Sequence, residues 1–241
     1  MENRPIIAIL RWEQGLVPEG LLQLEAMPGN STNPDTYPFP IKMVEVSGAC
    51  VETVITNPSQ KLLQDMVSIV KELKEKDGIR AVTTSCGFNA IFQRQLADSV
   101  DIPVLTSSLL QVPFVHNLIG KEKSIGIITA NKSSLTTEHM RACGITEDMK
   151  TVVFGLEKAK EWGTIFDNPD QKFDEKIVEQ EIIATAKEGI REFPEIGAIV
   201  LECTDLPPFA KKISEATGLP VFDYTTMIGY AALALGQINM Y

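Results

Sequence analysis

Two of the four cysteines stand where an apolar run gives way to a helical stretch. Cys86 lies in "AVTTSCGFNA" (81–90) and Cys203 lies in "IVLECTDLPPFA" (199–210). Ligands bind beyond the carboxyl ends of parallel strands, and the N–H groups at a helix start stabilise an anion. A lone cysteine at a strand end is more often a packing residue. The thiolate is the reactive form of cysteine, and because these two cysteines are placed symmetrically in a repeat, we nevertheless predict that both thiols do chemistry.

A repeat relates the two cysteines. An alignment that places Cys86 on Cys203, with an offset of 117 residues, also places Pro103–Val104 on Pro220–Val221. In both halves this Pro-Val pair follows the cysteine by 17 residues and opens the next predicted strand. The repeat predicts two copies of one lobe, which face each other so that the two thiols line one cleft without a disulfide between them.

Short apolar runs rich in Val and Ile alternate with helical stretches along the chain. Parallel strands that are buried on both faces have this composition. The predicted strands are Ile6–Leu10, Ala81–Thr84, Val104–Leu105, Ile125–Thr129, Ala198–Leu201 and Val221–Phe222. Apolar residues at helical spacing predict long helices over 59–76 and 174–193. We therefore predict an α/β fold of two pseudo-symmetric lobes, each a mostly parallel sheet flanked by helices.

The repeat also predicts how the chain is divided. An N-terminal lobe of residues 1–116 plus 227–241 and a C-terminal lobe of residues 117–226 would each carry one of the two cysteines. The active site is expected in the cleft between the lobes. Residues 27–40 are dense in Pro, Gly, Asn and Ser and predict a long loop, a kind of segment that is often functional.

Composition and charge exclude several classes of partner. The net charge of -10 argues against binding of nucleic acid, and no apolar run approaches the roughly 20 residues that cross a membrane. Residues 1–10 lack a signal-peptide pattern, and we expect a cytoplasmic location, where thiols stay reduced. Cys50 and Cys143 have no partner at the repeat offset and are interpreted as packing residues. Without a CxxC pair, and with only His116 and His139 in addition, no metal site is expected.

The motifs "TSCGFNA" and "LECTDLP" resemble those of the aspartate/glutamate racemase superfamily. That superfamily includes aspartate, glutamate and hydantoin racemases, arylmalonate decarboxylase and maleate cis-trans isomerase, and the resemblance covers essentially the whole chain. In the racemases, two cysteines flank the α-carbon of the substrate. One removes its proton and the other returns a proton from the opposite face, without a cofactor. The resemblance implies these catalytic roles for Cys86 and Cys203, and roles in substrate binding for Thr129 and Thr204.

The chain departs from the superfamily pattern around these cysteines. Gly87 follows the first cysteine where the amino-acid racemases have Asn, and Asp205 stands where glutamate racemase has His. Arg11 stands where glutamate racemase carries an acidic residue; it either binds a substrate carboxylate in a bidentate manner or forms a salt bridge. Asn89 either contacts the substrate or is a polar residue of the first helical turn. These departures leave the identity of the substrate open.

The residues and the resemblance together predict a cofactor-independent racemase or epimerase of a small carboxylate-bearing substrate, such as an amino acid or a hydantoin. Thiols with a pKa near ~8.5 suit an acid and a base that exchange roles between enantiomers. One alternative is a cis-trans isomerase of a small unsaturated dicarboxylate that uses the same cysteine pair. An alternative of another class is a small-molecule binding or sensor protein. A homodimer or a higher homo-oligomer is compatible with each of them.

Overall fold

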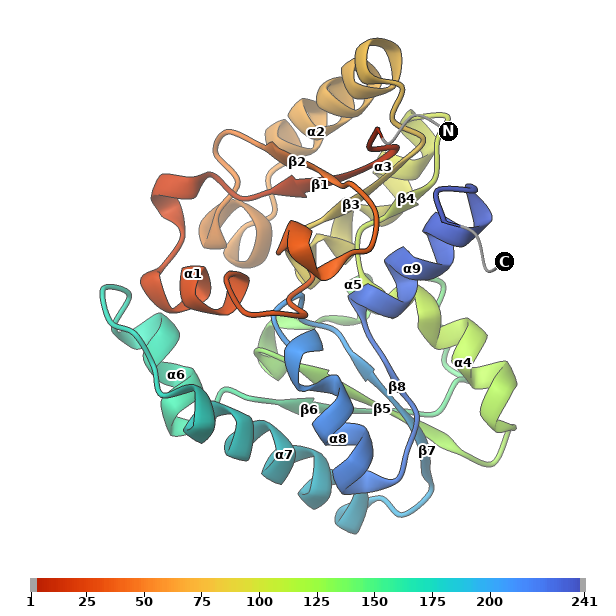
Figure 1. Ribbon diagram of the computed structural model, residues 1–241. Coiled ribbons are helices and arrows are strands. Elements are labelled where there is room, and N and C mark those ends of the chain that lie inside the picture. The colour runs from red at the N-terminus through yellow and green to blue at the C-terminus, as the bar shows by residue number, and fades with distance from the viewer. Residues whose placement is uncertain (1–3, 239–241) are drawn as a thin grey trace.

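The computed structural model describes residues 4–238 and contains two lobes, each built on a four-stranded parallel sheet (Figure 1). The strand orders are β2-β1-β3-β4 and β6-β5-β7-β8, with every neighbouring pair parallel. The strands are β1 Ile7–Arg11, β2 Lys42–Glu45, β3 Ala81–Thr84, β4 Val104–Leu105, β5 Ser124–Thr129, β6 Thr151–Gly155, β7 Ile196–Leu201 and β8 Val221–Phe222. The predicted two-lobed α/β fold is therefore confirmed.

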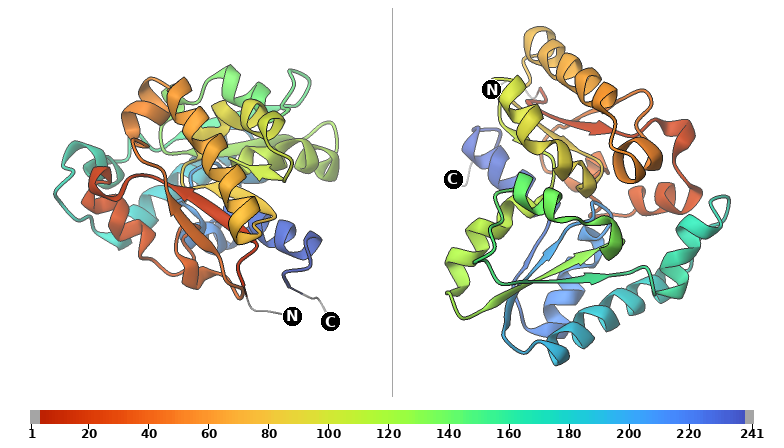
Figure 2. Two further views of the ribbon diagram at one scale, coloured as in Figure 1. Left: turned by 90° about the horizontal axis from the view of Figure 1, so that it is seen from above. Right: turned by 180° about the vertical axis from the view of Figure 1, so that it is seen from behind.

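Helices flank both sheets (Figure 2). The α-helices are α1 Glu19–Glu25, α2 Gln60–Glu72, α3 Gln93–Ser99, α4 Val112–Ile119, α5 Thr137–Ala142, α6 Lys160–Asp167, α7 Glu175–Glu192, α8 Ala210–Thr217 and α9 Tyr224–Ala234. Short 3-10 helices are η1 Gln14–Leu16, η2 Pro34–Thr36, η5 Gly87–Phe92, η6 Ser108–Gln111, η7 Lys132–Ser134 and η8 Pro207–Phe209. Single π-helical turns are η3 Glu52–Thr56 and η4 Leu73–Asp77.

The sequence prediction missed two strands, β2 and β6, which lie at sheet edges. No residue of either strand is fully buried. An edge strand pairs on one side only, so its sequence need not form the continuous apolar run that marks a central strand. The other two edge strands, β4 and β8, were predicted because a Pro-Val pair marks the start of each.

Both predicted long helices are present, and their ends have local causes. The helix predicted over 59–76 begins after Ser59, whose hydroxyl caps the first turn, and stops at Gly78, whose φ of 69° belongs to the left-handed region that favours glycine. The helix predicted over 174–193 begins after Asp174, whose carboxylate accepts two backbone N–H bonds. The two helices lie at opposite ends of the molecule, one in each lobe (Figures 1 and 2).

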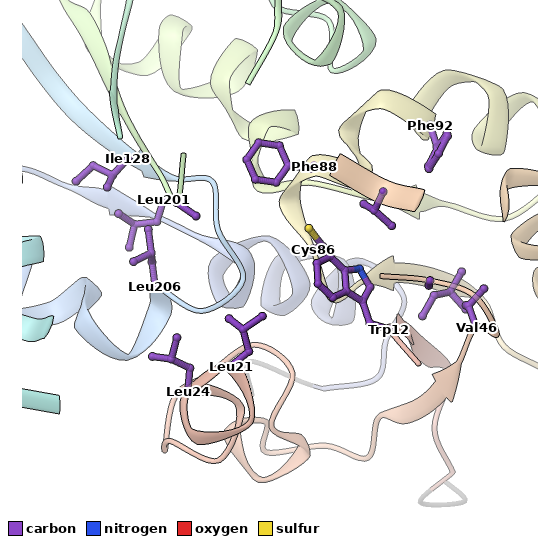
Figure 3. Packing of buried hydrophobic residues seen from close by; sticks show 14 of the residues in the cluster. Trp12, Leu21, Leu24, Val46, Cys86, Phe88, Phe92, Ile128, Leu201 and Leu206 are labelled. Atoms are coloured by element: carbon purple, nitrogen blue, oxygen red, sulfur yellow. The ribbon is translucent and has the colours of Figure 1, made fainter. Parts of the chain in front are cut away.

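The two lobes share one apolar core. The largest cluster of buried side chains includes Trp12, Leu24 and Phe88 from the first lobe and Leu201 and Leu206 from the second. Figure 3 shows these side chains facing one another across the junction. Continuous packing of this kind holds the lobes in a fixed relation, which a site built from both lobes requires.

The chain returns to the first lobe near its C-terminal end. Helix α9 follows β8 of the second sheet, yet its Ile228 packs in a cluster with Ile7 and Ala81 of the first sheet. The predicted division at 116/117 and 226/227 stays a prediction, and its ends, residues 1–3 and 239–241, lie outside the described residues. Across residues 4–238, no helix is both long and apolar enough to cross a membrane.

Two helical glycines allow a test of how tightly the second lobe is packed. A Cβ on Gly189 of α7 would lie 2.5–2.8 Å from atoms of the Phe154 ring, whereas a Cβ on Gly163 of α6 would lie no nearer than 3.7 Å to a side-chain atom. We expect Gly189→Ala to lower the free energy of unfolding by roughly 1–3 kcal/mol, because a well-packed core resists added volume. Gly163→Ala should be neutral or stabilising by up to about 1 kcal/mol, since Ala favours the helix. Urea unfolding of both variants measures the difference, and equal effects would contradict this packing.

Candidate active site

A pocket between the lobes is lined by residues that directly follow the central strands of both sheets. Trp12 follows β1, residues 85–88 follow β3, Ala130 follows β5 and residues 202–205 follow β7. The other lining residues come from helices and turns of both lobes: Val17, Leu21, Glu25, Ile55 and Phe166. The carboxyl ends of both sheets thus converge on one cavity, at the edge where open parallel sheets bind ligands.

Cys86 and Cys203 both line this pocket, and both are free thiols. The prediction that the two thiols share one cavity without a disulfide is confirmed. Burial raises the pKa of each thiol well above its usual value, and nearby acids raise it further, chiefly Glu202 for Cys86 and Asp205 for Cys203. The backbone N–H of Phe88 acts in the opposite direction on Cys86, as expected at a helix start. Both thiols are therefore neutral in the empty pocket.

Glu202 and Asp205 flank Cys203, and both carboxyls are buried. Glu202 accepts a hydrogen bond from the Thr129 hydroxyl at Oε2 (2.8 Å), while its Oε1 has no hydrogen-bond partner among the described residues. Asp205 accepts from Asn30 Nδ2 at Oδ1 (2.9 Å) and from Cys203 Sγ at Oδ2 (3.7 Å). Burial raises the pKa of Glu202 to about 7 and that of Asp205 to about 6, and these hydrogen bonds oppose the shift.

Glu25 of α1 adds a third carboxyl to the wall of the pocket. Burial, together with the charge of Asp205, raises the pKa of Glu25 to about 7, and the nearby Arg11 opposes this rise. Arg11 Nη2 lies 3.0 Å from Glu25 Oε2 and does not itself line the pocket. Of the two alternatives predicted for Arg11, the structure contains the ion pair; binding of a substrate carboxylate by Arg11 stays a prediction.

The remaining predicted binding residues lie at different distances from the cavity. Thr204 lines it, and its hydroxyl donates to the Ser85 carbonyl (2.8 Å), a bond that joins the two cysteine segments. Thr129 and Asn89 do not line the pocket. Thr129 holds Glu202, and Asn89 Nδ2 donates to the Cys86 carbonyl (3.2 Å). Contact of these three side chains with a substrate stays a prediction.

Neither Glu202 nor Glu25 is predicted from the sequence as part of the site, and Asp205 is noted there only as a departure from the family pattern. For two of them a signal was present, since "LECTD" places an acid on both sides of Cys203. Glu25 had none, because α1 is far from both cysteines in the sequence. Within residues 4–238, no group of three or more His, Cys, Asp and Glu side chains is arranged to hold a metal ion.

Solved structures identify the scaffold. An aspartate racemase from Picrophilus torridus has a TM-score of 0.60 at 14% identity, over 98% of this chain and 96% of that one. Unliganded arylmalonate decarboxylase has a TM-score of 0.59 at 14% identity, over 96% of this chain and 92% of that one. An allantoin racemase from Pseudomonas fluorescens gives 0.57 at 14% identity, over 95% and 91% of the two chains. The chain has the fold of the aspartate/glutamate/hydantoin racemase superfamily.

Sequence relatives of this racemase-fold chain have a different activity. It is 32% identical to a dimethylsulfoniopropionate lyase from Durusdinium sp. clade D, over 82% of this chain and 66% of that protein. It is 30% identical to dimethylsulfoniopropionate lyase 7 from Emiliania huxleyi (strain CCMP1516), over 69% of this chain and 50% of that protein. This chain thus spans two thirds or less of the length of these relatives. No family model matches the sequence.

These relatives correct the predicted function. The prediction of a racemase or epimerase is wrong, because the curated relatives are named as lyases. For the same reason these relatives do not support the predicted isomerase class. The coarser prediction of an enzyme agrees with their names. The error has a physical reason: one fold supports several activities, as the similarity to both racemases and a decarboxylase shows, so the short motifs that carried the resemblance indicate the scaffold and not the reaction.

Gly87 is required where the two cysteine segments meet. A Cβ at this position would lie 2.0 Å from Glu202 Oε1 and 2.2 Å from the Glu202 backbone oxygen. We expect Gly87→Ala to destabilise the fold by roughly 1–3 kcal/mol, measured by thermal or urea unfolding. Combining it with Glu202→Ala should not restore stability, because the backbone oxygen remains. Full recovery in the double variant would contradict this close approach.

The raised pKa of Glu202 makes stability depend on pH. Between the usual pKa of 4.5 and about 7, the folded chain holds a proton that the unfolded chain releases, so ionisation destabilises the fold as pH rises through this range. Glu202→Gln cannot ionise. Its free energy of unfolding relative to the unmodified chain should therefore be about 3 kcal/mol higher at pH 8 than at pH 4.5. Urea unfolding at both pH values measures this difference, and a pH-independent difference would assign Glu202 an ordinary pKa.

Proposed function

We propose that this chain is a dimethylsulfoniopropionate lyase, which eliminates dimethyl sulfide from its substrate and leaves acrylate. The observation that carries the proposal is the chemistry of the pocket wall. Two free thiols stand among three carboxyls and the rings of Trp12, Phe88 and Phe166, and the lining residues include no Lys, Arg or His. Carboxyls and aromatic faces attract a cation, and the substrate named for the sequence relatives carries a sulfonium cation.

The proposed reaction is a β-elimination that needs one base. The base removes a proton from the α-carbon, the electron pair of that C–H bond forms the carbon–carbon double bond, and the β-carbon–sulfur bond breaks. Its electrons stay on sulfur, so dimethyl sulfide leaves as a neutral molecule and needs no proton. The removed proton remains on the base and is released to water afterwards. One thiolate is sufficient for this chemistry, whereas racemisation also needs a protonated thiol as the acid on the opposite face.

We assign proton removal to Cys203. Its thiol donates to Asp205 Oδ2, so a carboxylate is in place to accept the thiol proton once a bound sulfonium has lowered the thiol pKa. Asp205 has a pKa of about 6, which leaves it largely ionised at neutral pH. Cys86 accepts from the backbone N–H groups of Phe88 and Asn89 and, unlike Cys203, does not donate its thiol proton to a carboxylate among the described residues. We assign to Cys86 a role in holding the substrate.

The electrostatics of the pocket link base formation to substrate binding. In the empty pocket, burial and the neighbouring acids keep both thiols neutral. A sulfonium beside them favours the ionised thiol, because an opposite charge within a few ångströms lowers a thiol pKa. Proton removal then combines a thiolate with a sulfonium and yields a neutral thiol and a neutral sulfide. Apolar surroundings strengthen the attraction between such charges.

The test is product formation by the purified chain. Incubation with dimethylsulfoniopropionate should release dimethyl sulfide and acrylate in equal amounts, measured by gas and liquid chromatography. Cys203→Ser should lower the rate by at least about 10³-fold, since a hydroxyl is a far weaker base than a thiolate and general bases contribute 10²–10⁴-fold. Cys86→Ser should lower it by about 10-fold or more.

The matched control is Cys50→Ser, a cysteine outside the pocket whose sulfur contacts Thr53. This variant should keep the full rate. No acrylate from the unmodified chain, or full activity in the double variant Cys86→Ser, Cys203→Ser, would overturn the proposal. The cytoplasmic location and the homo-oligomer stay predictions.

A further inference from the structure

Among the described residues, Glu202 is the one carboxyl of the pocket wall that has neither an ion-pair partner nor hydrogen bonds to both of its oxygens. The carboxyl of Glu25 is paired with Arg11 (3.0 Å), and both oxygens of Asp205 accept hydrogen bonds, from Asn30 and Cys203. Glu202 is fully buried and uses only Oε2, which accepts from Thr129. A buried polar atom without a partner is rare and requires an explanation.

The surroundings of Glu202 supply no positive charge. The titratable groups that face it are the thiols of Cys86, Cys203 and Cys143 and the hydroxyl of Tyr224, contributed by four different segments of the chain. Each of these groups is neutral or negative when it titrates. An ionised Glu202 would therefore stand in a region with no compensating cation from any of them.

Glu202 is nevertheless close to the space that a ligand would occupy. Both Glu202 and Gly87 line the pocket, and Oε1 lies against the backbone of Gly87. Position 87 has no side chain, which lets the carboxyl approach the backbone this closely at the pocket wall. Coulombic attraction to a cation in the pocket does not require direct contact.

We propose that Glu202 is the specificity-determining residue of the pocket: its carboxylate binds the cationic centre of an onium substrate, one whose cation carries no N–H or O–H donor. The inference rests on the proposed function for the identity of the ligand. A primary ammonium brings three N–H donors that must each find an acceptor, whereas Glu202 presents a single unpartnered oxygen. A sulfonium or a quaternary ammonium has no such donors, so one carboxylate can compensate its charge without further acceptors.

Binding of such a cation is coupled to loss of a proton. With its pKa of about 7, Glu202 holds a proton in most molecules at pH 6. A bound cation favours the ionised carboxylate, so binding at pH 6 releases a proton from Glu202. Glu25 has the same raised pKa of about 7 although it is paired with Arg11, so the share of proton release that belongs to Glu202 is the part that Glu202→Gln removes.

The experiment is titration calorimetry with ligands that cannot undergo the reaction. The probes are trimethylsulfonium as the cation alone, 3-(trimethylammonio)propanoate as the zwitterion and propanoate as the anion alone. Each is titrated at pH 6 and pH 8 in two buffers with different ionisation enthalpies, which gives the number of protons released. We expect the two cationic probes to bind, with up to one proton released at pH 6 and almost none at pH 8.

Glu202→Gln should weaken binding of both cationic probes by at least 10-fold at pH 8 and abolish most of the proton release at pH 6, with propanoate unaffected. The matched control is Glu195→Gln, an exposed acid beside the other end of β7, which changes net charge equally and should alter nothing. A cooperative urea-unfolding transition of Glu202→Gln at pH 8 checks that the variant is folded.

Unchanged affinity for trimethylsulfonium in Glu202→Gln, or no binding of either cationic probe by the unmodified chain, overturns the inference. The proposed function is tested separately, by formation of acrylate from dimethylsulfoniopropionate. If acrylate forms but cation binding does not depend on Glu202, only the inference about Glu202 is rejected. Glu202-dependent cation binding without acrylate from dimethylsulfoniopropionate rejects the lyase and leaves the cation site in place.

Discussion

The carboxyl group of Glu202 is packed against the backbone of Gly87, shielded from water, with one oxygen held by Thr129 and the other without a partner. This arrangement raises the pKa of Glu202 and adds negative charge beside both thiols. Glu202 therefore contributes to the raised pKa of both thiols and to the pH dependence of stability, together with burial and with Asp205 and Glu25. A cation bound in the pocket, as proposed above, would offset this negative charge.

The junction between the lobes serves to hold that arrangement. The Thr204 hydroxyl bonds the Ser85 carbonyl, and the loop predicted over 27–40 reaches across so that Ser31 Oγ donates to the Thr204 carbonyl (2.7 Å) and Asn30 to Asp205. The bonds from Ser31 and Asn30 are buried and the bond from Thr204 is partly buried, and losing a partner in a buried bond costs more than an exposed bond contributes. The long loop, expected to be functional from its composition, thus fastens the segment that carries Cys203.

A shared scaffold can support different reactions because the demands on the cysteines differ. Racemisation needs an acid and a base on opposite faces of one carbon. Elimination of a neutral sulfide needs one base and a site that tolerates a cation. The similarity to solved structures at 14% identity establishes the scaffold of two lobes. The reaction depends on what surrounds the thiols, which here are acids and aromatic rings, without Lys, Arg or His among the lining residues.

The sequence by itself determined the two-lobed parallel architecture, since Val- and Ile-rich runs and the 117-residue repeat report local periodicity and symmetry. It also placed Cys86 and Cys203 at strand ends, because a strand end is a local feature. It missed the half-exposed edge strands β2 and β6, whose pairing depends on neighbours. Only the tertiary structure brought Glu25 to the cysteines and left Oε1 of Glu202 unpartnered. Burial and charge pairing are properties of surroundings contributed by distant segments, and no local pattern encodes them.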